Sequence, residues 1–205
     1  MAGRWREWRR LLGGYIYWQF RAGVAAWAIA WAGAASAQDL ALRFAPADTK
    51  VEFTLGDVLH TVHGTFQLTR GEFRVDAATG KASGELAVDA ASGASGNASR
   101  DRRMTSEILE SARFPEIVFR PDRVDGKVAA QGRSQVEVHG EFSIHGAEHE
   151  MLIPAEVDAS AGVYTATLRF TVPYQKWGMK NPSVLLLRVG DKVEIVVHAV
   201  GRGGT

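Results

Sequence analysis

The sequence predicts an all-β domain of mostly antiparallel strands with one short helix. From Leu40 onward, apolar and polar residues alternate along many short runs, separated by turns rich in Gly, Asp and Asn. Only residues 99–112 show helical spacing of their apolar side chains. Glycines at positions 64, 84 and 140 lie inside the runs, where glycine often marks a bend. These bends favour a closed barrel over a β-sandwich.

The alternation divides the chain into about eight strand segments. The expected segments are 49–55, 60–69, 71–76, 81–90, 116–124, 133–145, 149–157 with 163–172, and 184–200 as a hairpin. Gly190-Asp191 is the turn signal of that last hairpin, and residues 145–148 predict another turn. The helix carries Met104, Ile108 and Leu109 on one face, and Pro115 stops it.

The first 37 residues have the three parts of a secretory signal peptide. The start is basic, a run of small or apolar residues follows from Ala22 to Ala35, and Ala35-Ser36-Ala37 forms a small-residue cleavage site. We therefore expect a signal peptide at residues 1–37 and one domain at residues 38–205, periplasmic or secreted. The basic residues are Arg4, Arg6, Arg9, Arg10 and Arg21.

Two alternatives stay open for this segment. Residues 11–35 would serve as a retained membrane anchor, although Arg21 within it would cost about 2.5 to 3.5 kcal/mol on insertion. Arg9-Arg10 would instead belong to a twin-arginine export signal.

The chain has 205 residues and no cysteine, which excludes disulfides, thiol catalysis and thiolate metal sites. Without residues 1–37, it keeps 19 basic and 22 acidic residues, so its net charge is about −3. A mildly acidic domain has no electrostatic footprint for nucleic acid, and we expect no nucleic-acid partner.

Three motifs resemble the YceI-like family. Asn97-Ala98-Ser99-Arg100-Asp101, with Met104 and then Phe114-Pro115-Glu116-Ile117-Val118-Phe119, is similar to the family's Arg-Asp helix start and its Phe-Pro-x-Ile-x-Phe strand. The stretch VHGEFSIHG at 138–146 resembles its G-x-L-x-I-H-G strand and turn, and VHGTF at 62–66 resembles its early V-x-G-x-F strand. The likeness covers most of residues 45–200.

The resemblance implies a lipocalin-like barrel of eight antiparallel strands with an elongated apolar tunnel. It also implies a periplasmic protein that binds a polyisoprenoid or a related long lipid. One motif departs, because the family's C-terminal Arg-x-x-Tyr/Phe-Gly is replaced by a stretch with Trp177-Gly178 and no preceding arginine. The lipid therefore stays open among polyisoprenoid, quinone-like and fatty acyl or amide chains.

An eight-stranded barrel holds either packed side chains or one small ligand. Small residues such as Gly64, Gly140 and Ala166 interleave with the large apolar ones and favour an unfilled interior. A filled core, and with it a structural barrel that binds a partner, remains an alternative. The expected ligand-binding residues are Phe53, Val62, Phe66, Leu68, Phe73, Leu86, Val88, Phe119, Phe142, Ile144, Leu168, Phe170, Tyr174, Trp177 and Met179. The last three lie in a loop that would either gate the barrel mouth or plug it.

Arg100 and Arg103 belong to a basic cluster at the helix start, which is either a solvated surface or a contact for a lipid headgroup. A rival reading is a metal-dependent enzyme that uses His145, His149 and nearby acids, although their spacing is not that of the helical zinc motif. No G-x-S-x-G stands at a strand-to-helix turn. We expect no catalytic residue, no metal and no cofactor, and a homodimer is compatible with the sequence.

Overall fold

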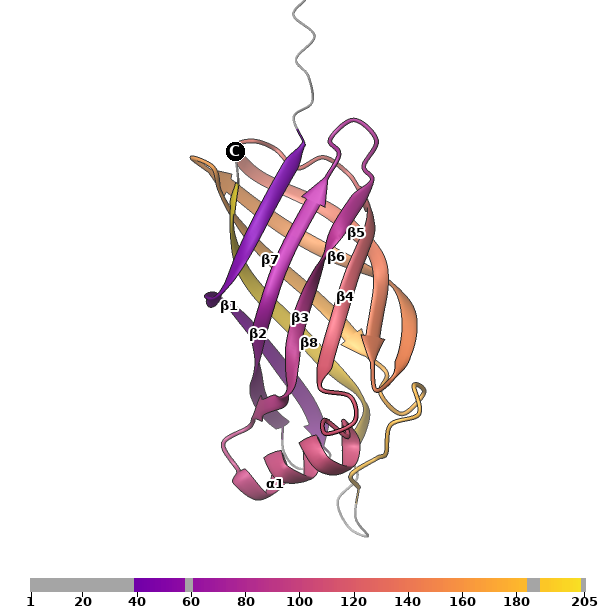
Figure 1. The fold of residues 1–205 in the computed structure, drawn as a ribbon. Coiled ribbons are helices and arrows are strands. Elements are labelled where there is room, and N and C mark those ends of the chain that lie inside the picture. Colours follow the sequence, from indigo (N-terminus) through magenta and orange to yellow (C-terminus); the bar gives the residue numbers. More distant parts are fainter. Residues whose placement is uncertain (1–38, 58–60, 184–188, 204–205) are drawn as a thin grey trace, which may run out of the picture. The chain divides into compact units, whose positions relative to one another are not determined.

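Eight antiparallel strands form a closed barrel in the computed structural model, which describes residues 39–57, 61–183 and 189–203 (Figure 1). Each strand pairs with the next in the sequence, and the last pairs with the first. The predicted signal peptide lies outside the described residues. The strands are β1 (Leu40–Asp57), β2 (Thr61–Val75), β3 (Ala82–Ala94), β4 (Glu116–Asp125), β5 (Gly132–Ile144), β6 (Ala147–Ser160), β7 (Val163–Val172) and β8 (Val189–Gly203). The predicted all-β barrel is confirmed.

Alternation along each strand decides which side chains face the interior. On β5, Val136, Val138, Gly140, Phe142 and Ile144 are buried, while the residues that alternate with them are more exposed. The pattern changes phase within β1, because its pairing with β8 shifts register between Phe44 and Thr49. Such an irregularity moves the apolar face from even-numbered to odd-numbered positions of the strand.

Two groups of predicted strand segments are divided differently in the structure. The segments 60–69 and 71–76 form one strand, β2, whose pairing with β3 shifts register between Leu68 and Arg70. Segments 149–157 and 163–172 are parts of two strands, β6 and β7, joined by a tight turn at Ala161 and Gly162, both with positive φ.

The predicted hairpin at 184–200 is wrong. Gly190 and Asp191 lie inside β8, which starts at Val189 and pairs with β1 on one side and β7 on the other. Long-range pairing overrides a local turn signal here, because the ladder satisfies backbone groups along the whole strand. The first part of the predicted hairpin, residues 184–188, lies outside the described residues.

The predicted helix is present but shorter than residues 99–112. It comprises α1 (Ala98–Arg103) and a π-helical turn, η1 (Met104–Ile108). The side chain of Asn97 caps α1 by accepting hydrogen bonds from the backbone N–H groups of Ser99 and Arg100, at 3.1 Å each. The helix lies across one end of the barrel (Figure 1), with Leu109 buried in the apolar cluster at that end.

Two of the strand ladders are short. β3 and β4 pair only between Leu86–Asp89 and the stretch 116–119, apart from one isolated bridge between Lys81 and Arg123. β6 and β7 pair only between residues 155–160 and 163–168. The barrel wall therefore has two seams at which other contacts must hold neighbouring strands together.

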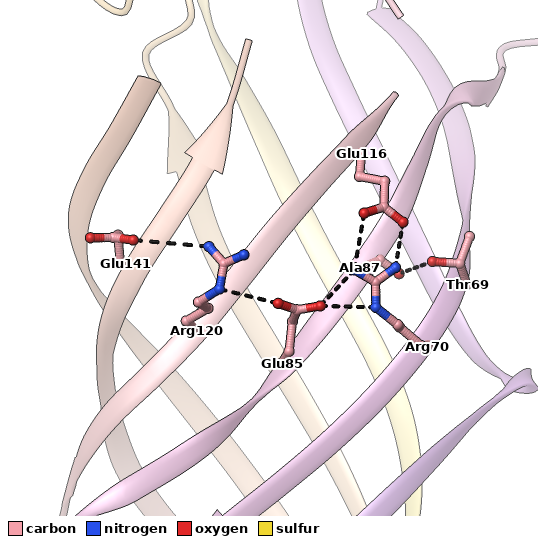
Figure 2. A network of polar contacts seen from close by, with 7 residues as sticks. All are labelled: Thr69, Arg70, Glu85, Ala87, Glu116, Arg120 and Glu141. Carbon is pink, nitrogen blue, oxygen red and sulfur yellow. Dashed lines mark hydrogen bonds and ion pairs between the residues drawn. The ribbon is translucent and has the colours of Figure 1, made fainter. Parts of the chain in front are cut away.

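An ionic network crosses the β3–β4 seam on the outer face of the barrel (Figure 2). Arg70 of β2 contacts Glu85 of β3 and Glu116 of β4, while Arg120 of β4 contacts Glu85 at 3.1 Å and Glu141 of β5 at 4.0 Å. Hydrogen bonds to Glu116 and Glu85 raise the pKa of Arg70, and the bond from Arg70 lowers the pKa of Glu116. The network thus ties four consecutive strands together over the short β3–β4 ladder and at its end, where Glu85 and Arg120 follow the last backbone pair, Leu86 with Phe119.

Candidate ligand-binding cavity

The interior of the barrel contains a cavity of about 700 Å³, a volume typical of small-molecule binding sites. Side chains from all eight strands line it, together with residues from α1, η1 and the segment 173–183. The alternative of an interior filled by packed side chains therefore does not hold for this structure. A barrel of eight strands is just wide enough for one such cavity.

The lining is apolar along almost its whole length, because the alternating residues of each strand face inward. Aromatic rings pack against one another in this lining. The ring centroids of Phe53 and Phe66 are 5.3 Å apart, and those of Phe142 and Phe170 are 5.9 Å apart in an edge-to-face arrangement. Lining positions on β5 run from Val136 to Ile144, which corresponds to about 20 Å along the axis of a tilted barrel. The space is therefore elongated and oily.

All but one of the predicted ligand-binding residues line this cavity. They are Phe53, Val62, Phe66, Leu68, Phe73, Leu86, Val88, Phe119, Phe142, Ile144, Leu168, Phe170, Tyr174 and Met179. Trp177 is the exception and lies outside the lining. Arg100 and Arg103 also line the cavity, at the end that carries α1.

The sequence reasoning missed part of the lining. The same alternation would have identified Val136, Val138 and the β8 residues 193, 195 and 197, all of which line the cavity. Leu42 and Phe44 were harder to find, because they precede the register shift of β1 and stand out of phase with Val51 and Phe53. The alternation of Leu40, Leu42 and Phe44 was the available signal, but that these residues belong to the same strand as Val51 and Phe53 follows only from the pairing with β8.

Segment 173–183, which follows β7, forms part of the cavity wall. Tyr174 and Met179 are each 4% exposed and line the cavity, whereas Trp177 points to β6, where its ring stacks on His149. The hydroxyl of Tyr174 donates a hydrogen bond to the carbonyl oxygen of Gly190 at 2.7 Å. Burial, and then the charge of Asp191, raise the pKa of this hydroxyl. The segment therefore packs against the apolar cluster at the end of the barrel that carries α1.

Among the residues that the structure describes, the hydrogen-bonding side chains of the lining gather in one stretch, residues 95–103, apart from Tyr164 and Tyr174. The stretch contributes Ser95, Asn97, Ser99, Arg100 and Arg103. Arg100 donates from Nε to Ser95 Oγ at 2.7 Å and from Nη2 to the Ser95 carbonyl at 2.8 Å, while Arg103 donates to Glu107 at 3.2 Å. One end of an otherwise apolar cavity is therefore polar and cationic.

The two turn histidines considered for a metal site lie in different surroundings. His145 has Nε2 3.4 Å from Glu110 Oε1 and its ring 4.8 Å from that of Phe114. His149 faces Trp177 instead, and burial lowers its pKa. In the described part of the chain, no group of three or more His, Cys, Asp or Glu residues is arranged to hold a metal ion. The predicted histidine pair is thus not assembled into a centre.

Within residues 39–57, 61–183 and 189–203, no helix has the length and apolar character needed to cross a membrane.

Comparison with known proteins gives consistent matches. The family model of the YceI-like domain matches residues 42–200. UPF0312 proteins of Pseudomonas savastanoi pv. phaseolicola and Pseudomonas syringae pv. tomato are each 28% identical over 160 residues, covering 74% of this chain and 81% of theirs.

Solved structures share the fold. BcnA of Burkholderia cenocepacia aligns with a TM-score of 0.64 and 16% identity, covering 77% of this chain and 98% of that one. A polyisoprenoid binding domain from Saccharophagus degradans, implicated in plant cell wall breakdown, aligns with a TM-score of 0.63 and 14% identity, covering 80% and 99%. At these identities, the likeness establishes the barrel architecture.

Proposed function

This chain belongs to the YceI-like family, and we propose that it binds one long apolar lipid, such as a polyisoprenoid, and sequesters or carries it. The observation that carries the proposal is the elongated cavity, which apolar side chains from all eight strands line. The solved structure named as a polyisoprenoid binding domain, which shares this fold, supports the ligand class.

The energetics of such a site come from burial. An apolar chain gains about 0.8 kcal/mol for each CH₂ group that leaves water, so a long chain binds well with few polar contacts. The atoms that line a dry apolar cavity also lack van der Waals contacts on the side that faces the cavity, and a bound ligand supplies these contacts. Phe53, Phe66 and Phe142 present flat apolar surfaces for a chain lying along the barrel axis.

The proposed activity is binding alone. Among the described residues, the titratable side chains in the cavity lining are two arginines and two tyrosines, namely Arg100, Arg103, Tyr164 and Tyr174. Arginine stays protonated and tyrosine has an ordinary pKa near 10, so neither is a good general base at neutral pH. We therefore assign no catalytic step to this cavity.

We further propose that the protein is exported and that residues 1–37 are removed, because that segment has the layout of a signal peptide. Expression of the full chain in a Gram-negative host, followed by intact-mass analysis of the periplasmic fraction, tests this. A mass that starts at Gln38 is expected, and a full-length protein held in the membrane fraction would overturn it.

The binding proposal is tested by native mass spectrometry and lipid extraction of the protein purified from its own host. Ala166 lines the cavity, so Ala166→Phe places a ring in the lipid's path. Thr165 is exposed and lies one position away on the same strand, so Thr165→Phe is the matched control. We expect lipid with the wild type and with the control, and at least a tenfold loss with Ala166→Phe. Equal lipid content in all three proteins, or none in the wild type, would contradict lipid binding in the barrel.

A further inference from the structure

The polar part of the cavity lining is built from hydrogen-bond donors. Asn97, Ser99, Arg100 and Arg103 each carry N–H or O–H groups, and within the described part of the chain no Asp or Glu lines the cavity. Among the described residues that line the cavity, Arg100 and Arg103 are the only charged ones. A ligand's polar end would therefore meet donors and positive charge.

Arg100 has no acidic partner among the described residues. Its Nε and Nη2 groups donate to two oxygens of Ser95, which are neutral acceptors. The neighbouring carboxylate of Asp101 is occupied elsewhere, because it accepts hydrogen bonds from the backbone N–H and the hydroxyl of Ser95. The guanidinium is thus held in place by Ser95 while its charge stays unpaired.

Arg103 differs from Arg100, because Nε of Arg103 contacts Glu107 at 3.2 Å in an i,i+4 pair. A guanidinium has five N–H donors, so Arg100 keeps three of them free after its bonds to Ser95. Planar arginine donors match phosphate and carboxylate oxygens, and the charge makes such bonds roughly twice as strong as neutral ones. Arg100 is therefore the stronger candidate for an anion contact.

We propose that the cavity takes an amphiphile with an anionic oxygen head, a phosphate or a carboxylate, and that Arg100 binds this head at the α1 end. The inference rests on the proposed function, since it assigns the head of a lipid whose chain lies in the barrel. The residue is solvent-exposed, so the head stays hydrated at the mouth while the chain is buried beyond it.

The test compares matched ligands that differ only in the head. Geranylgeranyl phosphate and geranylgeraniol share one chain, and palmitate and hexadecanol share another. Dissociation constants of all four are measured by displacement of a fluorescent apolar probe. We expect each anion to bind about tenfold more tightly than its alcohol, which is the low end expected for charge-assisted hydrogen bonds at a hydrated site. A preference in only one pair still supports the proposal and identifies the head as phosphate or as carboxylate.

The matched variants are Arg100→Gln and Arg102→Gln. Arg102 is an exposed arginine of the same helix that does not line the cavity. We expect Arg100→Gln to weaken anion binding about tenfold and leave alcohol binding unchanged, and Arg102→Gln to change both less than twofold. Arg100→Lys keeps the charge and should keep most of the preference for the anion.

Each contrary outcome has a distinct meaning. Equal affinity of the wild type for anion and alcohol, or equal weakening of both by Arg100→Gln, would overturn the assignment of the head site while the chain site stands. Failure of all four ligands to displace the probe would instead overturn lipid binding itself. Alcohol binding by Arg100→Gln also reports that the variant barrel is folded.

Discussion

The ring of Trp177 stacks on the ring of His149, with centroids 3.9 Å apart and planes 7° from parallel. Trp177 follows β7, whereas His149 lies on β6, in the part of that strand that has no partner on β7. The ring centroid of Trp177 also lies 5.9 Å from that of Phe142 on β5. Among the described residues, no hydrogen bond joins segment 173–183 to β6. Side-chain stacking therefore closes the β6–β7 seam where the backbone ladder has ended.

Replacement of Trp177 by alanine should destabilise the barrel. The substitution removes a large half-buried ring and its stacking contact, so we expect the free energy of unfolding to fall by about 2 kcal/mol. Urea denaturation followed by circular dichroism measures this. Lys176→Ala, at the exposed neighbouring position, should change stability by less than about 0.5 kcal/mol. An equal effect of both substitutions would show that the stack does not hold the seam.

Stability should fall in mild acid because of His149. Burial lowers its pKa from the ordinary value of 6.5, and its strand neighbours Glu148 and Glu150 are exposed. Below pH 6.5 the imidazole of His149 binds a proton more readily in the unfolded chain than in the folded one. The contribution of neutral His149 to the free energy of unfolding is therefore complete above pH 6.5 and is lost as the pH falls through its lowered folded-state pKa.

His149→Phe keeps a ring against Trp177 but cannot be protonated. Urea denaturation of both proteins at pH 7.5 and pH 5.5 isolates the effect, since all other titrating groups are shared. We expect the wild type to lose more stability than His149→Phe across this interval. Identical losses would exclude His149 as the source of the pH dependence.

The network over the β3–β4 seam should contribute measurable, salt-dependent stability (Figure 2). Glu85 accepts hydrogen bonds from Arg70 at 2.6 and 2.8 Å and from Arg120 at 3.1 Å. A single surface ion pair contributes less than about 1 kcal/mol to the free energy of unfolding. Because Glu85 pairs with two arginines, we expect Glu85→Gln to lower the free energy of unfolding by about 1 kcal/mol at low salt. In 0.5 M NaCl, screening should reduce that cost.

Glu72→Gln is the control for this network, because Glu72 is more exposed and, among the described residues, forms an ion pair with Arg43 alone, with Nε of Arg43 3.5 Å from Oε1 of Glu72. Chemical denaturation with urea, which is uncharged, allows both salt conditions to be compared. A cost for Glu85→Gln that matches that of Glu72→Gln, or that is unchanged by salt, would argue against a network role.

Gly84 should be intolerant of any side chain. It has φ of +124°, and a Cβ atom built there would lie 2.2 Å from the carbonyl oxygen of Glu72. Gly96 also has a positive φ, +79°, but nothing lies within 4 Å of its Cβ position. We expect Gly96→Ala to cost about 1 kcal/mol through backbone strain, and Gly84→Ala to cost about 2 kcal/mol or more because a clash is added. If urea denaturation gave the same loss of unfolding free energy for Gly84→Ala and Gly96→Ala, a steric clash at Gly84 would be excluded as a cause.

The local pattern of residues was sufficient for much of the fold and of the cavity. Alternation placed Phe142 and Ile144 of β5 inside the barrel, and Asn97 with the residues after it predicted the helix start. These features depend on near neighbours in the chain: the pleat of a strand alternates side chains, and a cap satisfies the first N–H groups of a helix. The alternation and the strand glycines already favoured a closed barrel of about eight strands, and the family resemblance implied the same form.

The sequence by itself thus determined most of the strand segments, most of the side chains that face the interior, and that this interior is apolar. Tertiary structure alone decided that Gly190 continues a strand, that Trp177 packs on His149 outside the cavity lining, and that Arg100 lies at a charged end of the cavity. The physical reason is that these outcomes depend on contacts between segments far apart in the chain. The alternation and capping of a single segment carry no information about which distant strand will satisfy its backbone or cover its side chains.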